Sequence, residues 1–180
     1  NDPEIDLILV ADMPSRRAAR AIEAMEAGKD VMADKPGCTS LEQLQAIREC
    51  QARTGRIWSV DFSERFEVPC VTRAAELVAE GAIGRVVAVH SDFFLGVHFE
   101  GFRAQMPHVL LLDMAIHTFD QARFVTGSDA QTVYCNEWNP PVSWSGHEPS
   151  AVAIFEMDNG IVYTYRGSWC AEGLRTSWES

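Results

Sequence analysis

Blocks of apolar and polar residues alternate over the first 61 positions, and their lengths are those of short strands and helices. Residues 5–10 are nearly all apolar, which is typical of a central parallel strand buried on both faces. Residues 15–27 then place apolar side chains at helical spacing, and Gly28 follows as a residue that commonly ends a helix. The pattern predicts a strand followed by a helix.

The same order is repeated downstream. Residues 30–33 form a second apolar run, residues 41–53 have helical character up to Gly55, and residues 57–60 are a third short strand. The second helix is expected to begin with a capping box, made by Thr39 with Glu42 or by Ser40 with Gln43. Strands separated by helices predict a parallel sheet, in which ligands bind beyond the carboxyl ends of the strands.

The pattern changes after Asp61. Helices are expected over residues 69–80 and 110–126, and strands over residues 86–94, 131–135, 151–157 and 161–166. The last two strands are joined through Asp158-Asn159-Gly160, a strong signal for an antiparallel hairpin. We therefore expect an α/β domain over residues 1–61, followed by an α+β domain with a largely antiparallel sheet over residues 62–180.

The predicted helix over residues 110–126 has almost no polar face and should be buried nearly all round. Asp113, His117 and Asp120 nevertheless lie on one stripe of it. Buried charged groups need polar partners, so three interpretations stay open: a self-contained Asp–His pair, two ligands of a metal site, or a pair that faces a substrate. The metal interpretation lacks a third ligand at a recognisable spacing, and we predict no metal.

Lys35 stands between the second apolar run and Pro36. A lysine in such a place is commonly a solvated surface residue. At the carboxyl end of a parallel strand, however, it would lie at the edge of the sheet where ligands bind.

Several motifs occur in an order that resembles the Gfo/Idh/MocA family of nicotinamide-dependent sugar and cyclitol dehydrogenases. They are residues 6–11, residues 27–31, Asp34-Lys35-Pro36, residues 62–66, residues 80–86 and residues 112–117. The resemblance implies the second half of a Rossmann nucleotide-binding domain, followed by an incomplete α+β domain. The family's glycine-rich phosphate loop would lie upstream of Asn1, so the resemblance also implies an internal piece of a longer protein, inactive by itself and weak in NAD binding.

The resemblance further implies an oxidoreductase that moves a hydride between NAD or NADP and a sugar, cyclitol or related polyol. Its implied catalytic residues are Lys35, Asp113 and His117. Its implied cofactor-binding residues are Asp12, Met13, Arg17, Asp34, Lys35 and Pro36. Candidate substrate-binding residues are Arg65, Arg103, His108 and Asp113, and Asp120 is a candidate supporting partner.

Three motifs depart from the usual family pattern. The common Thr-Pro-x-x-x-His is replaced by a segment from Met13 to Ala18 that keeps only the proline. Asp34 replaces the glutamate of Glu-Lys-Pro, and Pro107-His108-Val109 replaces a glycine-rich stretch. These departures concern the cofactor contacts and the mouth of the substrate pocket.

Two other functions fit the same scaffold. One is a glycoside hydrolase that uses transient oxidation by NAD, and the other is a non-catalytic binding or assembly protein. Retention of Lys35, Asp113 and His117 together argues against the second.

The composition restricts the classes of partner that the protein is expected to bind. A formal net charge of -11 argues against nucleic acid or an anionic membrane, because both would be repelled. No apolar run approaches the ~20 residues of a membrane helix. The five cysteines include no Cys-x-x-Cys pair, which favours reduced thiols and a cytoplasmic location. We also expect a homo-oligomer formed through the sheet of the second domain.

Overall fold

The computed structural model describes residues 2–177, and the chain divides into two compact units, Asn1–Phe62 and Ser63–Ser180. Each unit has its own hydrophobic core, and each is described here by itself.

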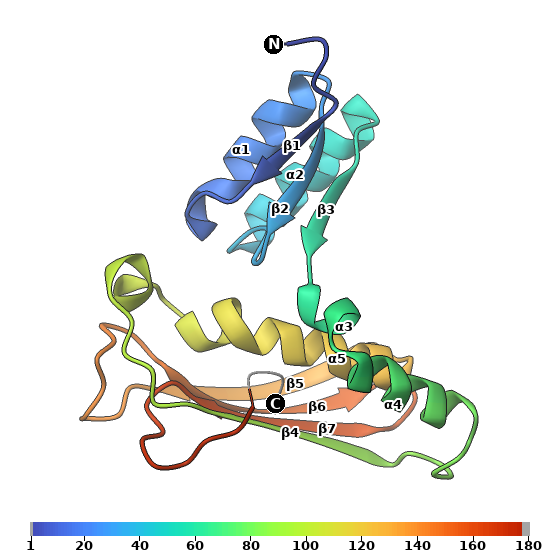
Figure 1. Cartoon of the computed structure of the whole chain (residues 1–180), viewed down its shortest axis with the longest axis vertical. Helices are drawn as coiled ribbons and strands as arrows, with labels where there is room; N and C mark the ends of the chain where they lie inside the picture. The colour runs from blue at the N-terminus through green and yellow to red at the C-terminus, as the bar shows by residue number, and fades with distance from the viewer. Residues whose placement is uncertain (1, 178–180) are drawn as a thin grey trace. The chain divides into compact units, whose positions relative to one another are not determined.

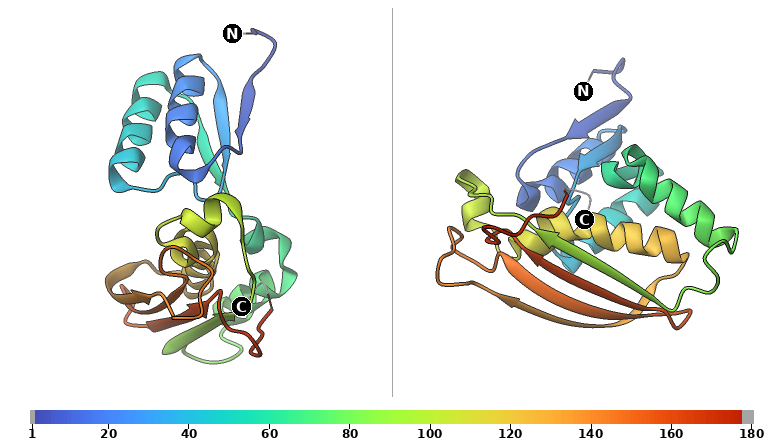
Figure 2. Two further views of the ribbon diagram at one scale, coloured as in Figure 1. Left: turned by 90° about the vertical axis from the view of Figure 1, so that its left-hand side faces the viewer. Right: turned by 60° about the horizontal axis from the view of Figure 1, so that its bottom comes forward.

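The first unit has the predicted alternation of strands and helices (Figure 1). Its elements are β1 (Leu7–Val10), α1 (Pro14–Glu26), β2 (Asp30–Asp34), α2 (Leu41–Thr54) and β3 (Trp58–Asp61). The strands form a parallel sheet in the order β1-β2-β3, and both helices cover the same face of it (Figure 2). Helices on one face bury apolar residues such as Met25, Val31 and Ile47, which are fully buried. The predicted partial Rossmann sheet is confirmed.

The start of α2 follows from the predicted capping box. Ser40 Oγ accepts a hydrogen bond from the Gln43 N–H at 3.2 Å, and Gln43 Oε1 accepts one from the Thr39 N–H at 2.8 Å. These bonds satisfy backbone donors that the first helical turn leaves without an intrahelical acceptor. The helix ends at Gly55, whose φ of 67° favours glycine.

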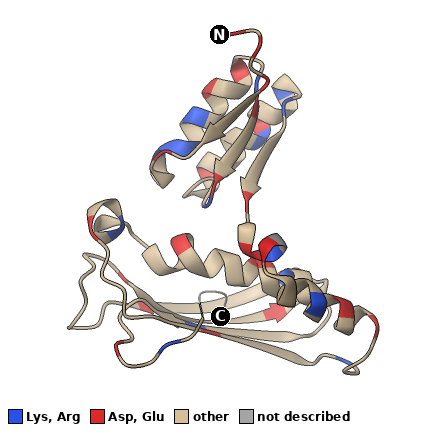
Figure 3. Cartoon of the chain, viewed as in Figure 1, with Lys and Arg blue, Asp and Glu red and all other residues tan. Residues whose placement is uncertain are grey.

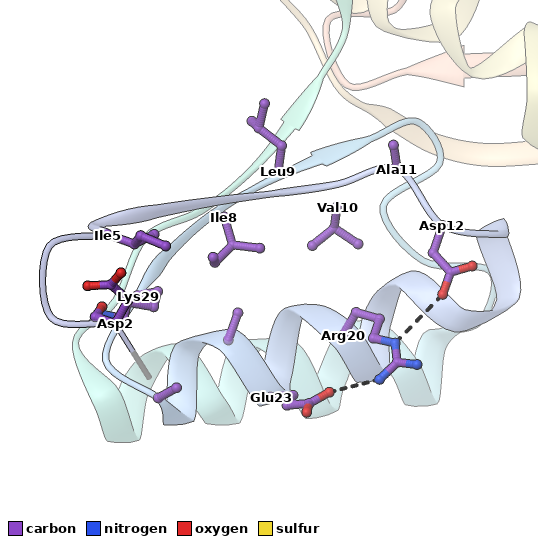
Figure 4. Close-up of a pocket in the computed structure, with 12 residues that line it drawn as sticks. Asp2, Ile5, Ile8, Leu9, Val10, Ala11, Asp12, Arg20, Glu23 and Lys29 are labelled. Carbon is purple, nitrogen blue, oxygen red and sulfur yellow. Dashed lines mark hydrogen bonds and ion pairs between the residues drawn. The ribbon is translucent and has the colours of Figure 1, made fainter.

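Strand β1 differs from the expectation of a central strand buried on both faces. Within residues 2–177 it pairs only with β2 and forms the edge of the sheet. Val10 turns toward α1 and is 6% exposed, whereas Leu9 points to the opposite face and is 70% exposed (Figure 4). An open pocket of about 450 Å³, lined partly by Ile5 and Ile8, runs along this strand. The apolar run over residues 5–10 therefore arises because β1 carries apolar side chains on both faces. Other described residues cover only one of these faces.

The second unit is built on a four-stranded sheet. Its elements are α3 (Ser63–Glu67), α4 (Pro69–Ala79), β4 (Ala88–Phe94), the 3₁₀ turn η1 (Gly101–Gln105), the π-helical turn η2 (Leu111–Ala115), α5 (Ile116–Thr126), β5 (Ala130–Trp138), β6 (Ser150–Met157) and β7 (Val162–Ser168). The strand order is β4-β7-β6-β5. Pairing is antiparallel except between β4 and β7, which confirms the predicted largely antiparallel sheet.

Helix α5 lies along one face of this sheet (Figures 1 and 2). The core of this unit includes Phe93, Tyr163, Tyr165 and Trp169, each at most 2% exposed, and Phe119 of α5 meets both tyrosine rings edge to face. The Phe93 and Trp169 rings meet edge to face, with centroids 4.9 Å apart. The strands carry few charged residues along their length (Figure 3).

The predicted helix over residues 110–126 begins with an irregularity. Its first part is the π-helical turn η2, and only from Ile116 is it α-helical. Leu110 and Ala115 are fully buried, as the apolar pattern predicts. Phe119 and Asp120 are only partly buried, so the helix is not enclosed on every side.

None of the helices within residues 2–177 has the length and apolar character needed to cross a membrane. All five cysteines are free thiols.

Candidate functional site

The loop that follows β2 is organised by Arg17. The Arg17 guanidinium donates to the carbonyl oxygens of Asp34 at 3.0 Å, of Pro36 at 3.1 Å and of Lys35 between them. It also donates to Asp34 Oδ2 at 2.8 Å and, through Nε, to the Asp12 carbonyl at 2.7 Å. One side chain thus joins the carboxyl ends of β1 and β2.

Arg17 reaches this loop from the buried face of α1. It lies one turn before Ala21 and two turns before Met25, and it is only 4% exposed. A buried guanidinium is costly unless its donors find acceptors and its charge a partner. The backbone carbonyls supply the acceptors, and the Asp34 carboxylate, whose side chain is 48% exposed, supplies the opposite charge.

The loop residues differ in exposure. Pro36 is buried, Lys35 is half-buried, and the Lys35–Pro36 peptide bond is cis. Arg17 supports this loop through the main chain, because it donates to the carbonyl oxygen of Lys35.

The turn after β1 carries the other two predicted cofactor residues. The Asp12 carboxylate accepts a hydrogen bond from the Met13 N–H at 2.7 Å and lies 3.7 Å from Arg20 Nε (Figure 4). Met13 is 40% exposed. Both residues lie at the carboxyl edge of the parallel sheet, where ligands bind in folds of this kind.

In the second unit, Asp113 and His117 are each 4% exposed. Asp113 belongs to η2 and His117 to the first turn of α5. Arg103, from η1, forms a two-point ion pair with Asp113: Nε donates to Oδ2 at 2.8 Å and Nη2 to Oδ1 at 3.2 Å. The structure therefore brings together two of the residues that the sequence nominated separately.

Two aromatic rings hold the Arg103 guanidinium in place. Its central carbon lies 5.3 Å from the Phe99 ring centroid and 4.7 Å from that of Phe102. Phe99 in turn meets Trp144 edge to face at 5.5 Å. These contacts come from segments that sequence patterns do not connect with Asp113.

Arg65 and Asp120 form a second ion pair in this unit. Arg65 Nε lies 2.9 Å from Asp120 Oδ2, and the two side chains are 27% and 14% exposed. The Arg65 guanidinium also lies 4.8 Å from the centroid of the Phe124 ring. The pair ties α3 to α5. Its geometry supports a structural role for Asp120, while a substrate role for Arg65 stays a prediction.

His108 occupies an unusual backbone conformation just before η2. Its φ is 53°, a value rare for residues other than glycine. Its Nδ1 lies 2.7 Å from Glu137 Oε2, with His108 58% and Glu137 16% exposed. The sequence did not nominate Glu137. A signal was present, since Val133, Cys135 and Glu137 alternate along β5 and so place an acid where an apolar residue is expected.

Among residues 2–177, no group of three or more His, Cys, Asp or Glu side chains is arranged to hold a metal ion.

Two family models match the chain, and their boundary falls between the two units. Residues 1–62 match the oxidoreductase family with an NAD-binding Rossmann fold, and residues 71–179 match the GFO/IDH/MocA C-terminal domain. The chain belongs to the Gfo/Idh/MocA oxidoreductase family.

Individual relatives agree with this assignment. Inositol 2-dehydrogenase 2 of Saccharopolyspora erythraea is 30% identical over 166 residues, which span 90% of this chain and 47% of the relative. The scyllo-inositol 2-dehydrogenase (NAD(+)) of Bacillus subtilis is 27% identical over 88% of this chain and 47% of its own. A solved structure of a putative oxidoreductase from Erwinia carotovora atroseptica is 32% identical, with a TM-score of 0.81 over 97% of this chain and 55% of that one. The chain thus spans about half the length of these relatives.

Proposed function

We propose that the full-length protein is a nicotinamide-dependent dehydrogenase of a sugar, cyclitol or related polyol. The observation that carries the proposal is the buried pair on the η2–α5 helix, where Asp113 is held by Arg103 and His117 follows one turn later. Membership of an NAD-binding oxidoreductase family and relatives named as inositol dehydrogenases support it.

The residues at the carboxyl ends of β1 and β2 are suited to contact part of a nicotinamide dinucleotide. Arg17 fixes a loop that carries a cation, Lys35, at the sheet edge used for nucleotides. Asp12, Met13, Asp34 and Pro36 complete that edge. When bound, the nicotinamide supplies the acceptor or donor of the hydride.

His117 is assigned the role of general base. Removal of a hydride from a carbinol carbon requires the hydroxyl proton to leave as well, so a base must accept it. An imidazole, with an ordinary pKa of about 6.5, suits this task near neutral pH.

Lys35 is assigned the stabilisation of negative charge on the reacting oxygen. A fixed ammonium lowers the energy of a developing alkoxide more than that of a neutral hydroxyl, and so acts on the transition state. Asp113 is assigned a hydroxyl next to the reacting one, because a carboxylate accepts hydrogen bonds from polyol hydroxyls. Arg65 and His108 remain proposed contacts of the substrate.

We further propose that a second copy of the chain covers the outer face of the β4-β7-β6-β5 sheet. Helix α5 covers the other face, and the outer face presents Tyr134, Ile154 and Val162 at 67%, 46% and 40% exposure. Exposed apolar residues that adjoin one another on a flat sheet favour association. Light scattering of the full-length protein and of an Ile154→Glu variant tests this: a monomeric wild type would refute it.

The function is tested by incubating the full-length protein with NAD or NADP and a panel of inositols, aldoses and other polyols, followed at the absorbance of the reduced cofactor. Wild-type turnover of at least one polyol is expected. His117→Ala should lower kcat roughly 10²- to 10⁴-fold, the usual contribution of a general base, with cofactor affinity nearly intact.

His147→Ala is a suitable control because His147 is a half-buried loop residue outside the proposed site. Unchanged turnover in His117→Ala would remove His117 from the mechanism. Hydrolysis of a glycoside without net accumulation of reduced cofactor would replace the dehydrogenase by a hydrolase that oxidises its substrate transiently.

A further inference from the structure

Arg103 makes more specific contacts than an exposed surface arginine usually makes. Two of its three guanidinium nitrogens are bonded to the two oxygens of one carboxylate, and its plane lies against two phenyl rings. Two-point Arg–carboxylate pairs fix orientation as well as charge, because the planar fork matches only one arrangement of the acceptor. The geometry is that of a side chain holding another in a set direction.

The partner needs such support. Asp113 is 4% exposed and belongs to a π-helical turn among apolar neighbours. A carboxylate in such a place is unfavourable unless a positive charge and hydrogen bonds compensate its desolvation. Arg103 supplies both, and its own side chain remains 33% exposed.

The segment that carries Arg103 is itself anchored. The Gly146 N–H donates to the Ala104 carbonyl at 2.8 Å, and a Cβ added at Gly146 would lie 3.2 Å from that oxygen. Phe99 is packed edge to face on both Trp144 and Trp169, with centroids 5.5 and 5.0 Å away. The arginine is therefore presented by a braced turn, which is what a constant orientation of Asp113 requires.

We propose that Arg103 is a positioning residue that acts through Asp113: it holds the carboxylate in the orientation in which Asp113 binds a substrate hydroxyl. The inference rests on the proposed function, because it presumes that Asp113 contacts the substrate. It assigns to Arg103 a role in catalysis that requires no contact between its own guanidinium and the substrate.

The test is a double-mutant cycle in the full-length enzyme, on whichever polyol the wild type oxidises best. Arg103→Ala and Asp113→Asn should each lower kcat/KM roughly 10- to 100-fold, the usual cost of losing a partner that orients an active group. The double variant should be no slower than Asp113→Asn alone, because residues that act through one another are not additive. In both single variants, the loss of kcat/KM should also arise from a lower kcat and a higher KM in the same proportion.

Arg103→Lys separates orientation from charge. A lysine keeps the positive charge but cannot form the two-point pair, so this variant should lose nearly as much activity as Arg103→Ala. Guanidinium ions at low millimolar concentration should restore part of the activity of Arg103→Ala and none of that of Asp113→Asn. If Arg103→Ala does not fold, Arg103→Lys carries the cycle with Asp113→Asn.

Arg123→Ala is the matched control. Arg123 pairs with Asp129 in the same unit, but the two side chains are 54% and 68% exposed. This variant should keep wild-type kinetics, since exposed pairs contribute little.

Three results would overturn the inference. They are additive losses in the double variant, full activity in Arg103→Lys, and a lowered melting temperature of Arg103→Ala with unchanged kinetics. Failure of the proposed function looks different, because the wild-type enzyme itself would then oxidise no polyol with either cofactor.

Discussion

The two units use arginine differently to support the residues that the proposed reaction needs. In the first unit, Arg17 donates hydrogen bonds to three successive backbone carbonyl oxygens around Lys35. In the second unit, Arg103 forms a two-point ion pair with the side chain of Asp113. In the first unit, the atoms that Arg17 supports are main-chain atoms, whereas the proposed catalytic group of Lys35 is its side chain. In the second unit, the supported group and the proposed catalytic group are the same carboxylate, so stability and activity are coupled there.

The strongest way to break this comparison is to remove Arg17. Arg17→Ala leaves four carbonyl oxygens and the Asp34 carboxylate without this donor. We expect a loss of about 3 kcal/mol or more in the free energy of unfolding, because each buried acceptor left unsatisfied costs about 1–3 kcal/mol. Urea denaturation measures it. Arg16→Ala, next to it on the exposed side of α1, should change stability by no more than about 0.5 kcal/mol. Equal effects of the two substitutions would show that the Arg17 contacts do not hold the loop.

Lys35 tests the other half of the comparison. Lys35→Ala should lower kcat/KM of the full-length enzyme roughly 10²-fold or more, because a donor aimed at a developing oxyanion is lost. The Arg17 bond to the carbonyl oxygen of residue 35 should persist in this variant, because it does not involve the side chain that is removed. A drop in melting temperature with normal kinetics would make Lys35 a structural residue.

The smallest effect concerns the core of the second unit. Burial raises the pKa of Tyr163 and of Tyr165 well above the ordinary value near 10. Above that ordinary value the unfolded chain releases phenol protons that the folded chain retains. Stability should therefore be fully present below pH ~10 and fall as the pH rises further.

Tyr165→Phe should weaken this alkaline loss and change stability at pH 7 by no more than about 1 kcal/mol, since its hydroxyl has no hydrogen-bond partner among the described residues. Unfolding by urea at pH 7 and at pH 10.5 measures both quantities. An alkaline loss as steep in Tyr165→Phe as in the wild type would exclude Tyr165 as its source.

The sequence predicted much of the backbone and little of the side-chain pairing. The order of strands and helices, the cap of α2 and the burial of Asp113 and His117 follow from local spacing, and the structure confirms them. The strand ends were less accurate: β5 runs to Trp138 and not to residue 135, and β4 begins at Ala88 and not at residue 86. Arg17 could have been recognised as buried, because it lies four and eight residues before Ala21 and Met25 on the packed side of α1. The Arg103–Asp113 pair could not, because long side chains find partners through tertiary geometry that spacing along the chain does not encode.

The π-helical turn and the edge position of β1 also could not be predicted from the pattern of apolar and polar residues. A helical period of apolar residues does not distinguish η2 from a regular α-helical turn when all its sides are apolar. An apolar strand likewise does not reveal which neighbours it has. These features depend on packing partners supplied by other segments.

The parallel pairing of β4 with β7 sets an order on folding. Ala88 pairs with Val162, 74 positions later, whereas every bond from Arg17 to its loop closes within 19 residues. Closing a long stretch of chain costs entropy before any contact compensates for it, and such contacts slow folding. We therefore expect the turn around Lys35 to form early, while β4 keeps both edges unpaired until the β6–β7 hairpin arrives. This makes β4 open to wrong pairing as the second unit folds.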